Sequence, residues 1–134
     1  MAQIHALTPE GRLPTAAVQH VREIVTDTTW EVAIPLTADW HPGVSSQVTA
    51  YRTGNVVTVA AWRLSVNSGV TGDVIAYSLP PGYRMPPVTN LYGMEDSRGA
   101  ALSVVSNTVR IVAPSTSVSH HSFTFITLDP PPAQ

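Results

Sequence analysis

The chain has 134 residues, a formal net charge of −2, 43% hydrophobic and 12% charged residues, and no cysteine. This length fits one domain, and a nearly neutral chain without a basic cluster lacks the electrostatic footprint of a nucleic-acid binder. The absence of cysteine excludes disulfides and thiolate metal sites, and no apolar run reaches the ~20 residues of a membrane span, so we expect a soluble protein made in a cytoplasm.

The N-terminal segment is expected to form an extended arm over residues 1–12 and then one short helix over residues 15–26. Pro14 suits the first turn of a helix, and the apolar residues that follow recur at spacings of three and four. Such a short helix is marginal alone, so its stripe packs either on its own domain or on copies of itself around a symmetry axis. We assign residues 1–27 to attachment and trimerisation, through Ala17, Val21, Ile24 and Val25.

After Asp27 the apolar period changes from 3.6 to 2, which predicts strands. Trp30, Val32, Ile34 and Leu36 would form one buried face, and Pro35 indicates either an edge strand or an interruption of the ladder. A loop over residues 38–46 follows. Residues 47–52 and 56–64 then predict a hairpin, because the Gly54-Asn55 pair between them suits a tight turn.

Residues 72–87 read GDVIAYSLPPGYRMPP and predict a strand that ends in a rigid turn. Val74, Ile75, Tyr77 and Leu79 favour a strand. Pro80 and Pro81 have no N–H for a ladder, and Gly82 allows a left-handed backbone. Residues 80–87, which we call the proline corner, therefore hold an aromatic and a guanidinium, Tyr83 and Arg84, between two pairs of prolines.

The C-terminal half predicts further strands. They cover residues 88–94, a hairpin of 101–105 with 108–112, and a long strand over 117–128, with Val118, Phe123, Phe125, Ile126 and Leu128 as core candidates. Residues 129–134 form a proline-rich tail. The whole predicts a mainly β protein: an antiparallel β-sandwich or jelly-roll-like domain of about eight strands over residues 28–134, after the arm and helix.

No catalytic or metal-binding pattern is present, so we predict a protein that is not an enzyme and has no cofactor or metal. None of the histidines lies in a metal-ligand motif, and His120 and His121 are neighbours on a strand that point to opposite faces. An alternative is that a symmetric oligomer brings three copies of either histidine together on its axis, where they form a metal or anion site. No paired carboxylates, GxSxG or phosphate-binding glycine loop occurs.

Aromatic side chains near strand ends make a binding function better supported than catalysis. Trp40, Tyr83 and Tyr92, together with Arg84, are the candidate ligand contacts, since loops at strand ends are where β-scaffolds hold ligands. A ring can stack on a sugar without any charge, and Arg84 could pair with an acidic group across an interface, because its planar fork suits bidentate contacts. The alternative is that these rings belong to the core or to a subunit interface.

The proline corner carries a resemblance to a known family. Residues 72–86, with Leu79-Pro80 and Gly82-Tyr83-Arg84, resemble the G-x-V-I…L-P-x-G-Y-R-P corner of the C-terminal domains of phage tail-fibre and minor tail proteins from Gram-positive, especially actinobacterial, hosts. Residues 109–111 (VRI) fit the later strands of the same pattern. The resemblance spans residues 40–128. Met85, inserted between Arg84 and Pro86, departs from the motif.

The resemblance implies a non-catalytic, homotrimeric β-module displayed on a virion. Its expected partners are copies of itself, phage capsid or tail proteins bound through the N-terminal segment, and host cell-surface glycan. Both a capsid decoration or head fibre and a tail receptor-binding protein fit this pattern. The alternatives are a soluble carbohydrate-binding module and, third, a glycan hydrolase working at a subunit interface. No nucleic acid and no membrane insertion are expected.

Overall fold

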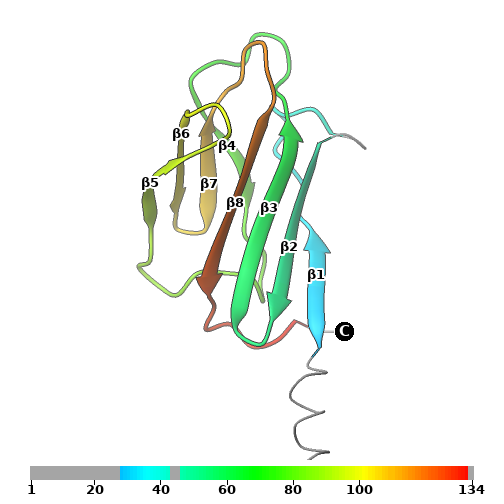
Figure 1. Ribbon diagram of the computed structural model, residues 1–134, viewed down its shortest axis with the longest axis vertical. Helices are drawn as coiled ribbons and strands as arrows, with labels where there is room; N and C mark the ends of the chain where they lie inside the picture. The colour runs from blue at the N-terminus through cyan, green and yellow to red at the C-terminus, as the bar shows by residue number, and fades with distance from the viewer. Residues whose placement is uncertain (1–27, 43–45, 133–134) are drawn as a thin grey trace, which may run out of the picture.

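The computed structural model describes residues 28–42 and 46–132, and these residues form two antiparallel four-stranded sheets (Figure 1). The first sheet has the order β1-β2-β3-β8 and the second β4-β7-β6-β5. The strands are β1 Thr29–Ala33, β2 Gln47–Thr53, β3 Val56–Leu64, β4 Asp73–Ser78, β5 Leu91–Glu95, β6 Ala101–Val105, β7 Thr108–Val112 and β8 Ser119–Ile126. The predicted mainly β, sandwich-like fold of eight strands is confirmed, whereas the predicted arm and helix, with Ala17, Val21, Ile24 and Val25, lie outside the described residues.

The first sheet follows the predicted hairpin. β2 and β3 pair from Gln47↔Trp62 to Thr53↔Val56, and Gly54 in the turn has a φ of 58°. β1 pairs only with β2, so it is the edge strand that Pro35 predicted. Alternation then sends Val48, Ala50 and Arg52 inward, and Thr49, Tyr51 and Thr53 outward.

Register shifts in three of the described strands break the alternation. In β5 the shift lies between Leu91 and Met94, so Tyr92 and Gly93 are both exposed. In β4 the register shifts between Ile75 and Tyr77, so Ala76 and Tyr77 are both buried. In β3 the shift lies between Ala61 and Leu64, so Trp62 and Arg63 are both exposed. An extra residue in one strand has this effect because it reverses which face the following side chains take.

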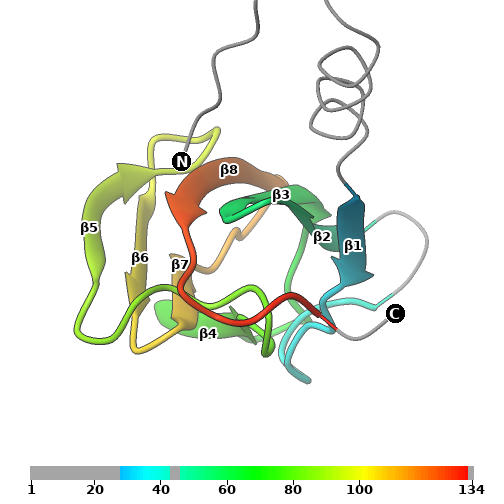
Figure 2. The ribbon, with the colours of Figure 1, turned by 90° about the horizontal axis from the view of Figure 1, so that it is seen from below.

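The core lies between the sheets and takes side chains from both. Phe123 is buried and Phe125 packs against the core, as predicted, but Ile126 and Leu128 are 63% and 72% exposed, so their assignment to the core is wrong. Since Phe125 faces inward, its neighbour Ile126 must face outward, and Leu128 lies beyond the strand. The strand predicted over 88–94 begins only at Leu91, after a turn. The C-terminal segment runs from β8 across the end of the sandwich toward β1 (Figure 2).

Candidate functional site at the proline corner

The proline corner begins as a tight turn closed by its own backbone. The N–H of Tyr83 donates to the carbonyl of Pro80 over 3.0 Å, and Gly82 has a φ of 90°. Proline at the second position and a positive φ at the third are the features of a type II turn. A Cβ on Gly82 would also lie 2.9 Å from Cγ of Pro132. Glycine is therefore required here both by backbone conformation and by space.

Arg52 holds this turn from inside the sandwich. Its side chain is 1% exposed, and its guanidinium donates to the carbonyl oxygens of Gly82 (2.7 Å), Asp129 (2.9 Å), Pro130 (3.1 Å) and Gly54 (2.8 Å). A further hydrogen bond goes to Oδ1 of Asn55 at 3.2 Å. The charge is thus distributed over neutral acceptors that come from three separate loops. Arg52 joins the β2–β3 turn, the proline corner and the C-terminal tail.

Asp129 ties the tail to the corner from the other side. Its Oδ2 accepts from the backbone N–H groups of Gly82 (2.9 Å) and Arg84 (3.2 Å), and from Nε of Arg84 at 3.1 Å. Burial opposes ionisation of this carboxyl, but the hydrogen bonds from Arg84 and Gly82 outweigh it and lower the pKa of Asp129 below its usual value. The guanidinium of Arg84 is therefore paired within the chain, at the surface, where the side chain is 46% exposed.

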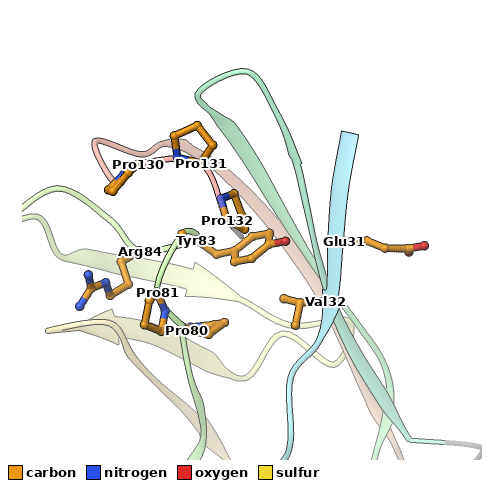
Figure 3. A pocket seen from close by; sticks show the side chains of 10 residues that line it. Glu31, Val32, Pro80, Pro81, Tyr83, Arg84, Pro130, Pro131 and Pro132 are labelled. Carbon is orange, nitrogen blue, oxygen red and sulfur yellow. The ribbon is translucent and has the colours of Figure 1, made fainter. Parts of the chain in front are cut away.

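A groove of about 440 Å³ lies beside the corner, between β1 and the tail (Figure 3). Tyr83 is only 4% exposed, and its hydroxyl is directed toward the strand that carries Glu31, whereas the side chain of Arg84 points the other way. Burial raises the pKa of Tyr83, which keeps the phenol protonated. The remaining lining residues are Val32, Gly82 and five prolines, at positions 80, 81 and 130–132. Such a lining offers shape and apolar contact, with no nucleophile paired to a base.

The four predicted ligand contacts do not form one site. Trp40 is 1% exposed, and its Nε1–H donates to the carbonyl of Ile75 over 3.1 Å, so the prediction that it contacts a ligand is wrong. Its loop turns inward because Trp40 forms a β-bridge with Val66 and its ring fills the core. Tyr92 is 68% exposed on β5, and no hydrogen bond or ring contact joins it to Tyr83 or Arg84 within the described residues.

Asp96 is the second carboxylate with internal partners. Its side chain is fully buried and accepts from Ser119 Oγ (2.6 Å), from Nε of Arg98 (2.8 Å) and from the N–H of Ala100 (3.0 Å). Burial opposes ionisation here too, but the hydrogen bonds from Ser119 and Arg98 prevail and lower the pKa of Asp96. This group fixes the β5–β6 turn against β8, a structural task.

His120 and His121 lie on opposite faces of β8, as predicted. His121 faces inward, where its Nε2 lies 2.6 Å from the hydroxyl of Tyr77 and its ring stacks between Tyr77 and Phe123. Burial lowers the pKa of His121 to about 4. His120 faces outward, with its ring centroid 4.4 Å from that of Trp62. No group of three or more His, Asp or Glu side chains in the described part of the chain could hold a metal ion.

No protein-family model, curated protein sequence or solved structure matches this chain. Within residues 28–42 and 46–132, no helix is long and apolar enough to cross a membrane. The resemblance of the proline corner to phage tail proteins therefore stays a prediction. The residues that sequence reasoning missed are Arg52 and Asp129, because their acceptors and donors lie on distant loops and leave no spacing pattern.

Proposed function

We propose that this protein is a non-catalytic structural module of a phage virion, displayed as a homotrimer and attached to the capsid or tail through its N-terminal segment. The observation that carries the proposal is that the polar groups at the proline corner form hydrogen bonds and an ion pair within the chain. Arg52, Asp129 and Arg84 bond to one another's loops, and Tyr83 is buried. The charged groups of this motif bind backbone groups of the chain or one another. Such an arrangement supports a structural role and offers no catalytic machinery.

The outer face of the first sheet supports self-association. Its central rows, read across β2, β3 and β8, pair Thr49 with Ala60 and Ser122, Tyr51 with Thr58 and Thr124, and Thr53 with Val56 and Ile126. These nine positions, which we call the uncharged face, carry no charged side chain, and the charged residues Glu31 and Arg63 of the same sheet lie on the edge strand β1 and near the end of β3. The second sheet differs, because its outer face carries Arg110 on the central strand β7 as well as Asp73 and Glu95 on its edge strands. A patch without charge can pack against copies of itself without like-charge repulsion.

Light scattering of the full-length chain tests the trimer. We expect three times the mass of one chain, and a substitution of Thr58→Arg, which puts a charge in the centre of the uncharged face, should shift the population toward monomer. Ser103→Arg on the outer face of the second sheet is the matched control and should leave the trimer intact. A monomer for the unmodified chain in dilute solution would contradict the proposal in this form.

Deletion of residues 1–27 tests the attachment. The truncated chain should lose its binding to phage particles and keep the cooperative unfolding of the β-domain. If the truncated chain still decorates particles, attachment runs through the sandwich instead.

A soluble carbohydrate-binding module is the second candidate, because three aromatic rings of the described residues are exposed: Tyr51 at 43%, Trp62 at 59% and Tyr92 at 68%. A glycan array distinguishes a protein that binds host glycan from one that only reinforces the particle, which we call a bracing protein. A bracing protein binds no glycan on the array, whereas an adhesive one binds a defined class.

A further inference from the structure

The bulge in β3 presents two consecutive side chains to solvent. Trp62 and Arg63 both face outward because the pairing with β8 shifts register between Ala61 and Leu64. Arg63 has a φ of 54°, a left-handed conformation that glycine adopts more easily than arginine. Residues held in such conformations concentrate at functional sites, where a bulge redirects a side chain. An arginine at a position that favours glycine therefore indicates a function for its side chain.

Two side chains satisfy the backbone of Arg63 and fix the bulge. The N–H of Arg63 donates to Nδ1 of His120 over 3.0 Å, and its carbonyl accepts from the hydroxyl of Ser46 at 3.0 Å. Since Nδ1 of His120 is the acceptor, the neutral imidazole carries its proton on Nε2 and can donate there. The His120 ring also contacts Trp62, with centroids 4.4 Å apart and planes tilted by 47°. The rings of Trp62 and His120 and the backbone of Arg63 thus form one cluster.

Arg63 differs from the arginines whose guanidinium groups have partners within the chain. The guanidinium groups of Arg52, Arg84 and Arg98 all form hydrogen bonds within the fold. For Arg63, no ion pair or side-chain hydrogen bond to another described residue occurs, and the residue is exposed beside a half-exposed tryptophan. The cluster therefore offers an aromatic surface, a cationic fork and an imidazole N–H donor at one place on the sheet.

We propose that Trp62, Arg63 and His120 bind a saccharide unit that bears an anionic group, either a carboxylate or a phosphate. The indole attracts the polarised C–H groups of a sugar ring through its negative π-face. The planar fork of Arg63 suits a carboxylate or phosphate in bidentate geometry, and Nε2–H of His120 adds a donor. This site goes beyond the virion role. It lies next to the face proposed for self-association, because Trp62 occupies the row after Ala60 on β3. Ligand binding and the mass of the oligomer are measured separately, so either proposal can fail without the other.

Titration of the full-length chain, followed by the NMR signal of the Trp62 indole N–H, tests the proposal. The probes are a tetrasaccharide of alternating glucuronic acid and N-acetylglucosamine, glucose 1-phosphate, and a neutral glucose tetrasaccharide. We expect saturable shifts with one or both acidic probes and at least tenfold weaker binding of the neutral one. The acidic probe that binds identifies the anion. No saturable shift with either acidic probe, or equal affinity for the neutral probe, would overturn the proposal.

Single substitutions test which side chains contact the acidic probe. Trp62→Ala and Arg63→Gln should each weaken binding of the acidic probe at least tenfold, with Trp fluorescence as the readout for Arg63→Gln and calorimetry for Trp62→Ala. The matched control is Arg110→Gln, another exposed arginine, which should bind as the unmodified chain does. An equal loss in this control would contradict a site at the bulge.

Arg63→Gly separates a binding role from a structural one. Glycine relieves the left-handed backbone, so the Tm should stay the same or rise while binding of the acidic probe falls at least tenfold. A lower Tm with unchanged binding would show that Arg63 serves the fold alone.

Discussion

The guanidinium of Arg52 donates a 2.7 Å hydrogen bond to the carbonyl oxygen of Gly82, 30 residues away in the sequence. This contact joins β2 of one sheet to the turn that follows β4 of the other. The same side chain reaches the carbonyls of Asp129 and Pro130, so the tail is fixed by the group that fixes the corner. The proline corner is therefore a closure of the sandwich end, organised around one buried arginine.

Replacing Arg52 by methionine should destabilise the domain by about 3–5 kcal/mol. Methionine fills much of the volume but leaves the carbonyls of Gly82, Asp129 and Pro130 without their donor, and buried unpaired acceptors are costly. Urea unfolding measures the change. The control is Arg110→Met on the outer face of β7, which should change stability by no more than about 0.5 kcal/mol. Similar effects of the two substitutions would show that Arg52 is not the organising group.

Two comparable turns follow the two proline pairs, one inside the proline corner and one directly after it. The residue with a positive φ is glycine in the first turn and valine in the second. Gly82 follows Pro80-Pro81 with a φ of 90°, and Val88 follows Pro86-Pro87 with a φ of 55° while the N–H of Thr89 donates to the carbonyl of Pro86 at 3.2 Å. Val88 is fully exposed, so its side chain gains nothing from packing. A β-branched residue is strained in this conformation, and only glycine is at ease there.

Val88→Gly should therefore stabilise the protein by on the order of 1 kcal/mol, because it removes that strain. Gly82→Ala should destabilise it by more than that, because the new Cβ would lie 2.9 Å from Cγ of Pro132 in a conformation unfavourable for alanine. Thermal unfolding of both variants gives the comparison. A destabilised Val88→Gly protein would indicate that Val88 makes a contact which holds the turn.

Stability should decrease as the pH falls from about 6.5 to about 4, because burial lowers the pKa of His121 over that range. Between these values the unfolded chain binds a proton that the folded chain does not, so folding is fully favoured above the upper value and weakened progressively below it. The loss at pH 4 is about 3 kcal/mol. The charge of Asp96 acts in the opposite direction but is the weaker effect.

Two histidine variants test this origin of the pH dependence. His121→Gln should flatten the curve of unfolding free energy between pH 6.5 and 4. His120→Gln, on the neighbouring residue that faces outward, should retain it. A further decrease below pH 4 is expected in all three proteins, since Asp96 and Asp129 have lowered pKa values and lose their stabilising charge as they become protonated. An unchanged slope in His121→Gln would assign the titration to another group.

The features of the fold that depend on neighbours in sequence were predictable. The hairpins at Gly54 and at Ser106-Asn107 carry turn residues with positive φ, and Pro80-Pro81-Gly82 ends β4 where the prolines lack donors. The bulges were not predicted, because the reversal of phase that one extra residue causes is masked where apolar side chains such as Ile75 and Trp62 also occupy the outward face.

The partners of Arg52 were hidden for a related reason. Its acceptors are backbone carbonyls, which every residue has, so no spacing distinguishes Gly82 or Pro130 in the sequence. Trp40 was predicted to contact a ligand because the residues around it are typical of an exposed loop. Its indole instead donates to the carbonyl of Ile75 inside the fold. Of the candidate site at the bulge, only the exposed ring of Trp62 could have been suspected from the sequence.

Mass spectrometry of gradient-purified phage particles tests the proposed virion role most directly. If the proposed role holds, particles of a phage that carries the gene should contain peptides of this chain in a fixed ratio to the major capsid or tail protein, and the ratio should persist through a second gradient. Recovery of the chain only from the soluble fraction of the lysate, with none on the particles, would contradict the proposed role.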